Sequence, residues 1–290
     1  MDLERVRNVA VIGAGTMGAG IAQTCSQAGF AVAMHDLESR FVDAGFARIR
    51  EPLMKRVERG KMTKDEVERI VAGIHGTTDL RAAVRGAQVV IEVIVEKIDA
   101  KKALFRELDA LCPPETVFTS NTSSLSITEM AGATHRPDRI VGIHFFNPAP
   151  VMKLVEIVRG SETSDATAAF VKAFAVKLGK EPVEVRESPG FVVNRLLVPM
   201  MNEAFNLLME GVATAEDIDR AMKLGTNMPM GPLELADYTG LDIGLDVMEV
   251  LHRETGDPKF RPSPLLRKYV RAGRLGRKTG RGVYEYPPVP

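Results

Sequence analysis

The sequence predicts an α/β fold in which a doubly wound, mostly parallel sheet is followed by a smaller all-α domain. Short apolar runs of β type alternate with helical patterns in the first two-thirds of the chain. Several of these runs are continuously apolar, as expected for parallel strands that helices cover on both faces. After Ser188-Pro189-Gly190 the strand patterns disappear. We therefore expect one domain at residues 1–187 and an all-helical domain at residues 188–290.

The expected elements follow one another along the chain in this order. Strands are predicted at residues 8–12, 31–35, 89–95, 117–120, 140–144 and 154–158. A long charged helical region at residues 40–74 separates the second and third strands, and a helix at residues 100–111 follows the third. In the second domain, helices are predicted at residues 191–210, from residue 214 onward, at 241–254 and at 263–272.

The bulk composition is that of a globular enzyme and excludes several other classes. Lysine plus arginine total 38 and aspartate plus glutamate also total 38, so no net charge favours nucleic acid or an anionic membrane. No stretch approaches the roughly 18 apolar residues of a membrane span. The charged start MDLERVRN leaves no room for a signal peptide, and two cysteines give no disulfide framework. We expect a cytoplasmic protein with no metal site and neither a nucleic-acid nor a membrane partner.

A glycine-rich motif follows the first predicted strand. Gly13-Ala14-Gly15-Thr16-Met17-Gly18 has the form GxGxxG and opens a predicted helix. In a Rossmann-like fold these glycines permit a tight turn, approach of the backbone to a pyrophosphate, and close packing of helix on strand. Asp36 lies 18 residues beyond Gly18, close to the position of an acid that binds ribose hydroxyls. Such an acid would repel a 2′-phosphate, so the predicted cofactor is NAD; the alternative is a plain strand–turn–helix with a surface aspartate.

Polar residues follow two further strands, at the edge of the sheet where ligands bind in such folds. Glu96 comes after the third strand, and Lys101 lies in the helix that follows. Asn121 and Ser123 come after the fourth strand, and Ser126 then opens a capping box that predicts the start of the next helix. We expect Asn121 and Ser123 to face the ligand crevice; ordinary loop polarity is the alternative.

The stretch HFFNPAPVMKLVE begins with His144 and ends with Glu156. Its prolines at positions 148 and 150 predict a turn, so the strand after them is expected to return antiparallel. If the hairpin is centred near Pro150, His144 and Glu156 lie opposite one another with Cβ atoms about 5 Å apart. The carboxylate would then orient the imidazole and favour its protonated form, as a general base acting on an alcohol requires. A structural His–Glu pair is the alternative.

Asn194 falls on the apolar stripe of the helix predicted at residues 191–210. A buried asparagine needs hydrogen-bond partners, which either another helix or a ligand carbonyl would supply. The sequence leaves both possibilities open.

Taken together, these residues resemble the 3-hydroxyacyl-CoA dehydrogenase family, in particular its short bacterial members that act on 3-hydroxybutyryl-CoA. The resemblance covers nearly the whole chain and rests on the ordered motifs VIGAGTMGAGIAQ, VVIEVIVE, SNTSSLSIT, HFFNPAPVMKLVE, SPGFVVNRLLVPM, AMKLGTNMPMGPLELAD and LGRKTGRGVYEY. It implies an NAD-dependent enzyme that reversibly oxidises (S)-3-hydroxyacyl-CoA to 3-ketoacyl-CoA.

The resemblance also implies roles for individual residues. His144 matches the family's catalytic base, Glu156 its carboxylate partner, and Ser123 and Asn194 its substrate-contacting residues. The NAD-site positions are matched by Asp36, Glu96, Lys101, Asn121, Ser123 and Asn147. The basic region around Lys55 would meet the CoA tail, with plain surface charge as the alternative, and the second domain would carry a homodimer contact.

Two rival functions remain open on the sequence. One is an NAD-dependent dehydrogenase of a free hydroxy acid, and the other is a dehydrogenase-like protein that binds NAD without turnover.

Overall fold

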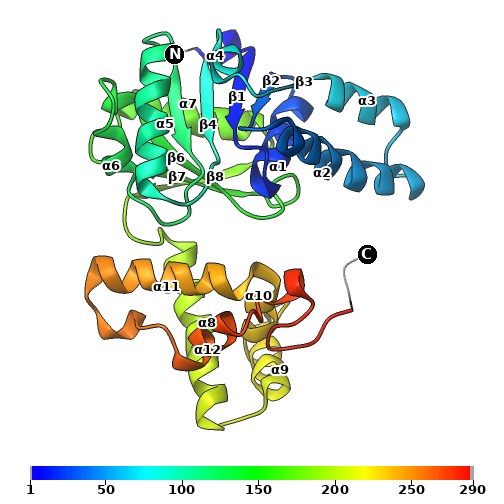
Figure 1. The fold of residues 1–290 in the computed structure, drawn as a ribbon, viewed down its shortest axis with the longest axis vertical. Helices are drawn as coiled ribbons and strands as arrows, with labels where there is room; N and C mark the ends of the chain where they lie inside the picture. Colours follow the sequence, from blue (N-terminus) through cyan, green and yellow to red (C-terminus); the bar gives the residue numbers. More distant parts are fainter. Residues whose placement is uncertain (1, 288–290) are drawn as a thin grey trace. The chain divides into compact units, whose positions relative to one another are not determined.

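The structure is a computed structural model and describes residues 2–287. The chain divides into two compact units, one ending at Ser188 and the other beginning at Pro189 (Figure 1). Each unit has its own hydrophobic core.

The first unit is built on an eight-stranded sheet with the order β3-β2-β1-β4-β5-β6-β7-β8. Neighbouring strands run parallel except β6 and β7, which are antiparallel. The strands are β1 (Asn8–Ile12), β2 (Ala31–His35), β3 (Ile74–Thr77), β4 (Val89–Glu92), β5 (Val117–Ser120), β6 (Ile140–Phe145), β7 (Leu154–Arg159) and β8 (Glu181–Arg186). The order reverses between β1 and β4, which is where ligands bind in such sheets.

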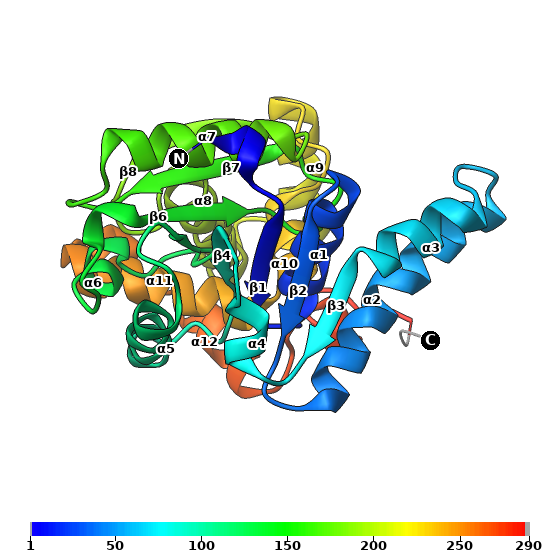
Figure 2. The ribbon, with the colours of Figure 1, turned by 90° about the horizontal axis from the view of Figure 1, so that it is seen from above.

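Helices cover both faces of this sheet, and Figure 2 shows α5 and α7 on opposite sides of it. The helices of the unit are α1 (Thr16–Gln27), α2 (Ser39–Glu58), α3 (Lys64–Ala72), α4 (Leu80–Val84), α5 (Ile98–Leu111), α6 (Ile127–Ala131) and α7 (Asp165–Lys177). Because the central strands are covered from both sides, β1 and β4 are almost entirely buried. The predicted α/β class is confirmed.

Several predicted boundaries differ from the observed ones. The region at residues 40–74 forms two helices, because Thr63 caps a new helix and its side chain accepts from the Glu66 amide. Strand β4 ends at Glu92 rather than at residue 95, because the Glu92 carboxylate accepts the Ile94 amide and the chain turns there. Strands β3 and β8 were not anticipated; they are the two edges of the sheet.

The second unit contains α8 (Val193–Glu210), α9 (Ala215–Thr226), α10 (Pro232–Thr239), α11 (Leu241–Thr255) and α12 (Pro264–Arg271). As predicted, α8 ends at Gly211, which adopts a left-handed φ of 72°. Thr214 caps α9 by accepting from the Asp217 amide, also as predicted. Helix α8 begins two residues later than residue 191, because Phe191 has a φ of 52°.

In the part of the chain that the structure describes, we find no helix that combines the length and the apolar character of a membrane span.

Candidate active site

The glycine loop joins β1 to α1. Gly13 has a φ of 114°, and a Cβ atom on it would lie 2.5 Å from the Val93 carbonyl oxygen. A Cβ on Gly18 would lie 1.8 Å from the Gly13 oxygen, whereas a Cβ on Gly15 would meet nothing within 4 Å. Packing within the protein therefore requires the first and third glycines. The space beside Gly15 is open, as a site for a pyrophosphate at the start of α1 needs.

Asp36, at the end of β2, lies beside this loop. Its Oδ2 accepts from the Ala14 amide and its Oδ1 from the Leu37 amide, each at 2.8 Å. The carboxylate thus sits between the glycine loop and the end of β2, which is the position expected for a group that binds the ribose hydroxyls of NAD. Together with the open space beside Gly15, this arrangement fits a dinucleotide.

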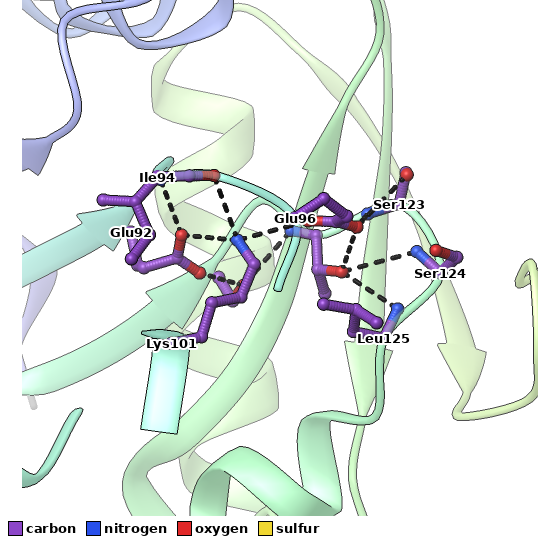
Figure 3. A network of polar contacts seen from close by, with 9 residues as sticks. Glu92, Ile94, Glu96, Lys101, Ser123, Ser124 and Leu125 are labelled. Atoms are coloured by element: carbon purple, nitrogen blue, oxygen red, sulfur yellow. Dashed lines mark hydrogen bonds and ion pairs between the residues drawn. The ribbon is translucent and has the colours of Figure 1, made fainter. Parts of the chain in front are cut away.

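Glu96, Lys101 and Ser123 belong to one polar network at the ends of β4 and β5 (Figure 3). Glu96 Oε1 accepts from the Ser123 amide at 2.9 Å and lies 3.3 Å from its hydroxyl. Glu96 Oε2 lies 3.2 Å from Lys101 Nζ. Glu96 therefore contacts both Lys101 and Ser123, although these predicted residues come from two separate segments, one after β4 and the other after β5.

Asn121 connects this network to β6. Its side-chain oxygen accepts from the Phe145 amide at 2.8 Å, one residue beyond His144. Ser126 caps α6 by accepting from the Glu129 amide, as predicted, but the Glu129 carboxylate pairs with Lys102 Nζ at 2.8 Å.

The turn between β6 and β7 carries Asn147, whose side chain is exposed. Lys180 holds this turn from inside: its Nζ donates to the carbonyl oxygens of Ala149 (2.5 Å) and Met152 (2.8 Å). Burial lowers the pKa of Lys180. Helix α1 approaches the same turn at Gly20, where a Cβ atom would lie 3.3 Å from the Ala149 Cβ. The turn is thus held against the helix that begins at the glycine loop.

His144 and Glu156 are register partners in the antiparallel pair β6–β7. The His144 Nδ1 lies 2.8 Å from the Glu156 Oε2, and only 7% and 1% of the two side chains is exposed. The ring of Phe146 stands beside the imidazole, with centroids 4.5 Å apart. The predicted register is therefore observed. An ionised carboxylate only accepts hydrogen bonds, so it favours the tautomer that carries the proton on Nδ1.

The remaining predicted residues lie apart from this cluster in the chain. Lys55 is exposed in the last turn of α2 and donates to Glu51 Oε1 at 2.6 Å. Asn194 lies half-buried in the first turn of α8, in the second unit. The fully buried asparagine of α8 is Asn202, which bonds the Arg261 carbonyl and the Ser263 amide.

Two buried charged residues of this region were missed in the sequence. Glu92 ends β4 with its side chain fully buried, and Lys180 lies under the β6–β7 turn. A carboxylate that closes the apolar run VVIE was the available signal for Glu92. Among residues 2–287, no group of three or more histidine, cysteine, aspartate or glutamate side chains could hold a metal ion.

Comparisons with known proteins agree with this architecture. Residues 8–188 match the model of the 3-hydroxyacyl-CoA dehydrogenase NAD binding domain, and residues 190–286 match that of its C-terminal domain. A probable 3-hydroxybutyryl-CoA dehydrogenase of Bacillus subtilis is 53% identical over 281 residues, which are 97% of this chain and 98% of the relative. The human mitochondrial hydroxyacyl-coenzyme A dehydrogenase is 44% identical over 97% of this chain and 91% of its own.

A solved structure gives the same result. The crystal structure of (S)-3-hydroxybutyryl-CoA dehydrogenase from Ralstonia eutropha superposes with a TM-score of 0.91 at 49% identity, covering 97% of this chain and 99% of that one. The resemblance noted in the sequence is thereby confirmed, and the chain belongs to the 3-hydroxyacyl-CoA dehydrogenase family.

Proposed function

We propose that this chain catalyses the reversible, NAD-dependent oxidation of (S)-3-hydroxybutyryl-CoA to the 3-keto thioester, with His144 as general base and Glu156 as its partner. Family membership supports the reaction and the cofactor. The observation that carries the assignment of residues is the buried hydrogen bond between His144 on β6 and Glu156 on β7, within a sheet that also carries a dinucleotide-type glycine loop.

The residues of the chain would hold NAD in the following way. The backbone around Gly15 and the start of α1 would receive the pyrophosphate, and Asp36 would bind the adenosine ribose. Glu96, Lys101, Asn121 and Asn147 follow strands β4, β5 and β6 and would line the rest of the cofactor site. The chemistry that the cofactor supplies is acceptance of the hydride that leaves C3 of the substrate.

His144 would take the proton of the 3-hydroxyl group. Since Nδ1 is engaged with Glu156, the proton passes to Nε2, and the imidazole becomes an imidazolium. The Glu156 carboxylate stabilises that cation in a site with little water, where charge–charge attraction is strong. As the O–H and C3–H bonds break, the C3–O bond becomes a carbonyl. Ser123 and Asn194 would hold the substrate oxygens so that C3 and the imidazole stay aligned.

The test is the variant His144→Gln. We expect turnover of (S)-3-hydroxybutyryl-CoA, followed as NADH absorbance, to fall by about 10²–10⁴-fold, because a positioned general base accelerates a reaction by about that factor. His75→Gln, which removes an exposed histidine on β3, serves as the matched control and should keep normal turnover. Near-normal activity of a folded His144→Gln variant would remove His144 from the role.

Two measurements separate the rival functions. If the chain instead oxidises a free hydroxy acid, 3-hydroxybutyrate without CoA will give NADH at a comparable rate. If it only binds NAD, fluorescence titration will show binding while no acyl-CoA produces NADH. An assay over acyl-CoA lengths in both directions would then define the preferred chain.

The remaining expectations extend this proposal to the rest of the chain. The domain at residues 1–187 would bind NAD, and the domain at residues 188–290 would contribute to substrate binding and to a homodimer. Apolar side chains exposed on the second unit support a dimer contact there: Leu196, Met209, Val212, Leu224 and Ile243. Light scattering of the purified protein tests the dimer.

Two expectations concern other parts of the chain. Lys55 would contact the CoA tail of the substrate. The buried free cysteines are consistent with a reducing compartment, and hence with a cytoplasmic location.

A further inference from the structure

The carboxylate of Glu92 is a fully buried group of the network at the ends of β4 and β5 (Figure 3). We propose that Glu92 is a positioning residue for the reaction: through Lys101 it fixes Glu96, and through Glu96 it fixes the loop that presents Ser123. This inference rests on the proposed function, since it assigns Glu92 a part in the turnover of the hydroxyacyl thioester.

Glu92 lies at the topological switch point of the sheet. It is the last residue of β4 and pairs in register with Ile12, the residue that precedes the glycine loop. None of its side chain is exposed. Its Oε1 accepts from Lys101 Nζ (2.5 Å) and the Ile94 amide (2.7 Å), and its Oε2 accepts from the Ser120 hydroxyl (2.5 Å). A buried carboxylate with this many donors is held in a single orientation.

Lys101 connects Glu92 to Glu96, because its ammonium group contacts both carboxylates. Only 1% of its side chain is exposed, and its ammonium group has three N–H donors. Acceptors for them lie at Glu92 Oε1, at Glu96 Oε2 (3.2 Å) and at the Ile94 carbonyl (3.4 Å). Each N–H group of the ammonium thus has an acceptor, and this fixes the position of Nζ. The contact between Lys101 and Glu96 therefore depends on the hydrogen bond between Lys101 and Glu92.

Glu96 carries the link to the next strand-to-helix loop. Its side chain is 38% exposed, so it stands at the surface of the network rather than inside it. Its Oε1 accepts from the Thr122 hydroxyl (2.6 Å) and from the Ser123 amide (2.9 Å). Thr122 Oγ1 in turn accepts from the Leu125 amide at 3.0 Å, which closes the loop on itself. The line of contacts therefore runs from the buried Glu92 to the backbone of Ser123.

A purely structural ion pair would behave differently from a positioning one. Replacing both members of a buried pair with neutral side chains of similar volume is often neutral for stability, because the desolvation cost of the charges disappears with their attraction. A variant without the pair should therefore fold. If the pair only fills the core, the hydrogen exchange of the Thr122–Leu125 amides should stay normal in that variant.

The test uses the double variant Glu92→Gln/Lys101→Met in the full chain. We expect its melting temperature to stay within a few degrees of the wild type, its kcat to fall at least tenfold, and hydrogen exchange of the Thr122–Leu125 amides to become at least tenfold faster without NAD. Hydrogen exchange reports the loop directly and does not depend on activity. A folded double variant with normal exchange of these amides would overturn the proposal even if kcat fell, because the loss of Lys101 from the cofactor site would by itself lower kcat.

The matched control is Lys102→Met/Glu129→Gln. Lys102 is the neighbour of Lys101 on α5, and its ion pair with Glu129 likewise connects α5 to another element, the helix α6, but both side chains are partly exposed. This control should change neither kcat nor the exchange of the loop; if it reproduced the effects of the first variant, any loss of a bridge to α5 would suffice and Glu92 would have no special part.

If the double variant does not fold, the variant Thr122→Val tests the proposal instead. It removes the hydroxyl that donates to Glu96 and leaves the pair Glu92–Lys101 in place. Unchanged amide exchange and unchanged kcat in this variant would overturn the proposal. The wild type separates this inference from the proposed function. Absence of NADH formation by the wild type refutes the function, whereas normal wild-type turnover with an unaffected variant refutes only the role of Glu92.

Discussion

Replacing Glu156 with glutamine removes the negative charge beside His144 and leaves the size of the side chain unchanged. The two groups are 2.8 Å apart and almost fully buried, so water cannot take over the lost interaction. A hydrogen bond to a charged group contributes about 1.5–3 kcal/mol. During the reaction that contribution acts on the imidazolium, which forms only as the hydroxyl proton is transferred.

The expected loss follows from this free energy. About 1.36 kcal/mol changes a rate tenfold, so the Glu156→Gln variant should lose a factor of roughly 10 to 150 in kcat. The value is a lower bound, because the glutamine amide can also present an N–H group to Nδ1. That would move the imidazole proton to Nε2 and leave no base facing the substrate. The KM values for NAD and for the thioester should change little.

The assay is steady-state formation of NADH from (S)-3-hydroxybutyryl-CoA, with circular dichroism to establish that the variant is folded. Glu181→Gln is the matched control, since Glu181 lies on the adjacent strand β8 with 75% of its side chain exposed. A folded Glu156→Gln variant that keeps kcat within threefold of the wild type would refute the argument, because the buried carboxylate would then contribute nothing to proton transfer.

Three further predictions concern the cofactor loop, the turn and a buried histidine. Gly18→Ala should lower both the melting temperature and NAD affinity, because its Cβ would meet the Gly13 oxygen at 1.8 Å, whereas Gly15→Ala should weaken only NAD binding in a fluorescence titration. Lys180→Met leaves two carbonyl groups without their buried donor and should cost roughly 1–3 kcal/mol of unfolding free energy in urea. Burial lowers the pKa of His35, so the unfolded chain takes up a proton near pH 6.5 before the native state does. Stability should therefore fall as the pH drops below 6.5, and His35→Gln should flatten that part of the curve.

The parts of the fold that the sequence predicted well are those with strong local patterns. The strands at residues 8–12, 31–35 and 117–120 are apolar runs between clear turn signals, and their observed bounds are the predicted ones. The hairpin could be placed because the residues that stop β6 and return the chain are all within one short stretch. Edge strands have weaker sequence patterns. Strand β8 contains Pro182 and alternates charged with apolar residues, a pattern that is compatible with an exposed edge strand but equally typical of a loop.

The candidate site could be predicted only in part from the sequence, for a related reason. His144 and Glu156 are 12 residues apart in one hairpin, so their contact followed from a turn position and an alternation of faces. Glu92 depends on partners on two other elements, Lys101 on α5 and Ser120 on β5, the latter 28 residues away. Whether a carboxylate at a strand end is solvated or enclosed depends on such long-range packing, which no local pattern contains.

The antiparallel return of β7 has a consequence for how related chains should be aligned. Length changes in the exposed part of the turn leave the two strands free to keep their pairing, since the extra residues simply bulge outward. One additional residue within β7 ahead of Glu156 is different, because it turns Glu156 and every later residue of the strand to the opposite side of the sheet. A relative could therefore retain both the histidine and the glutamate but carry one inserted residue between the turn and the glutamate. Its alignment would show both residues conserved, although their side chains would no longer be in contact.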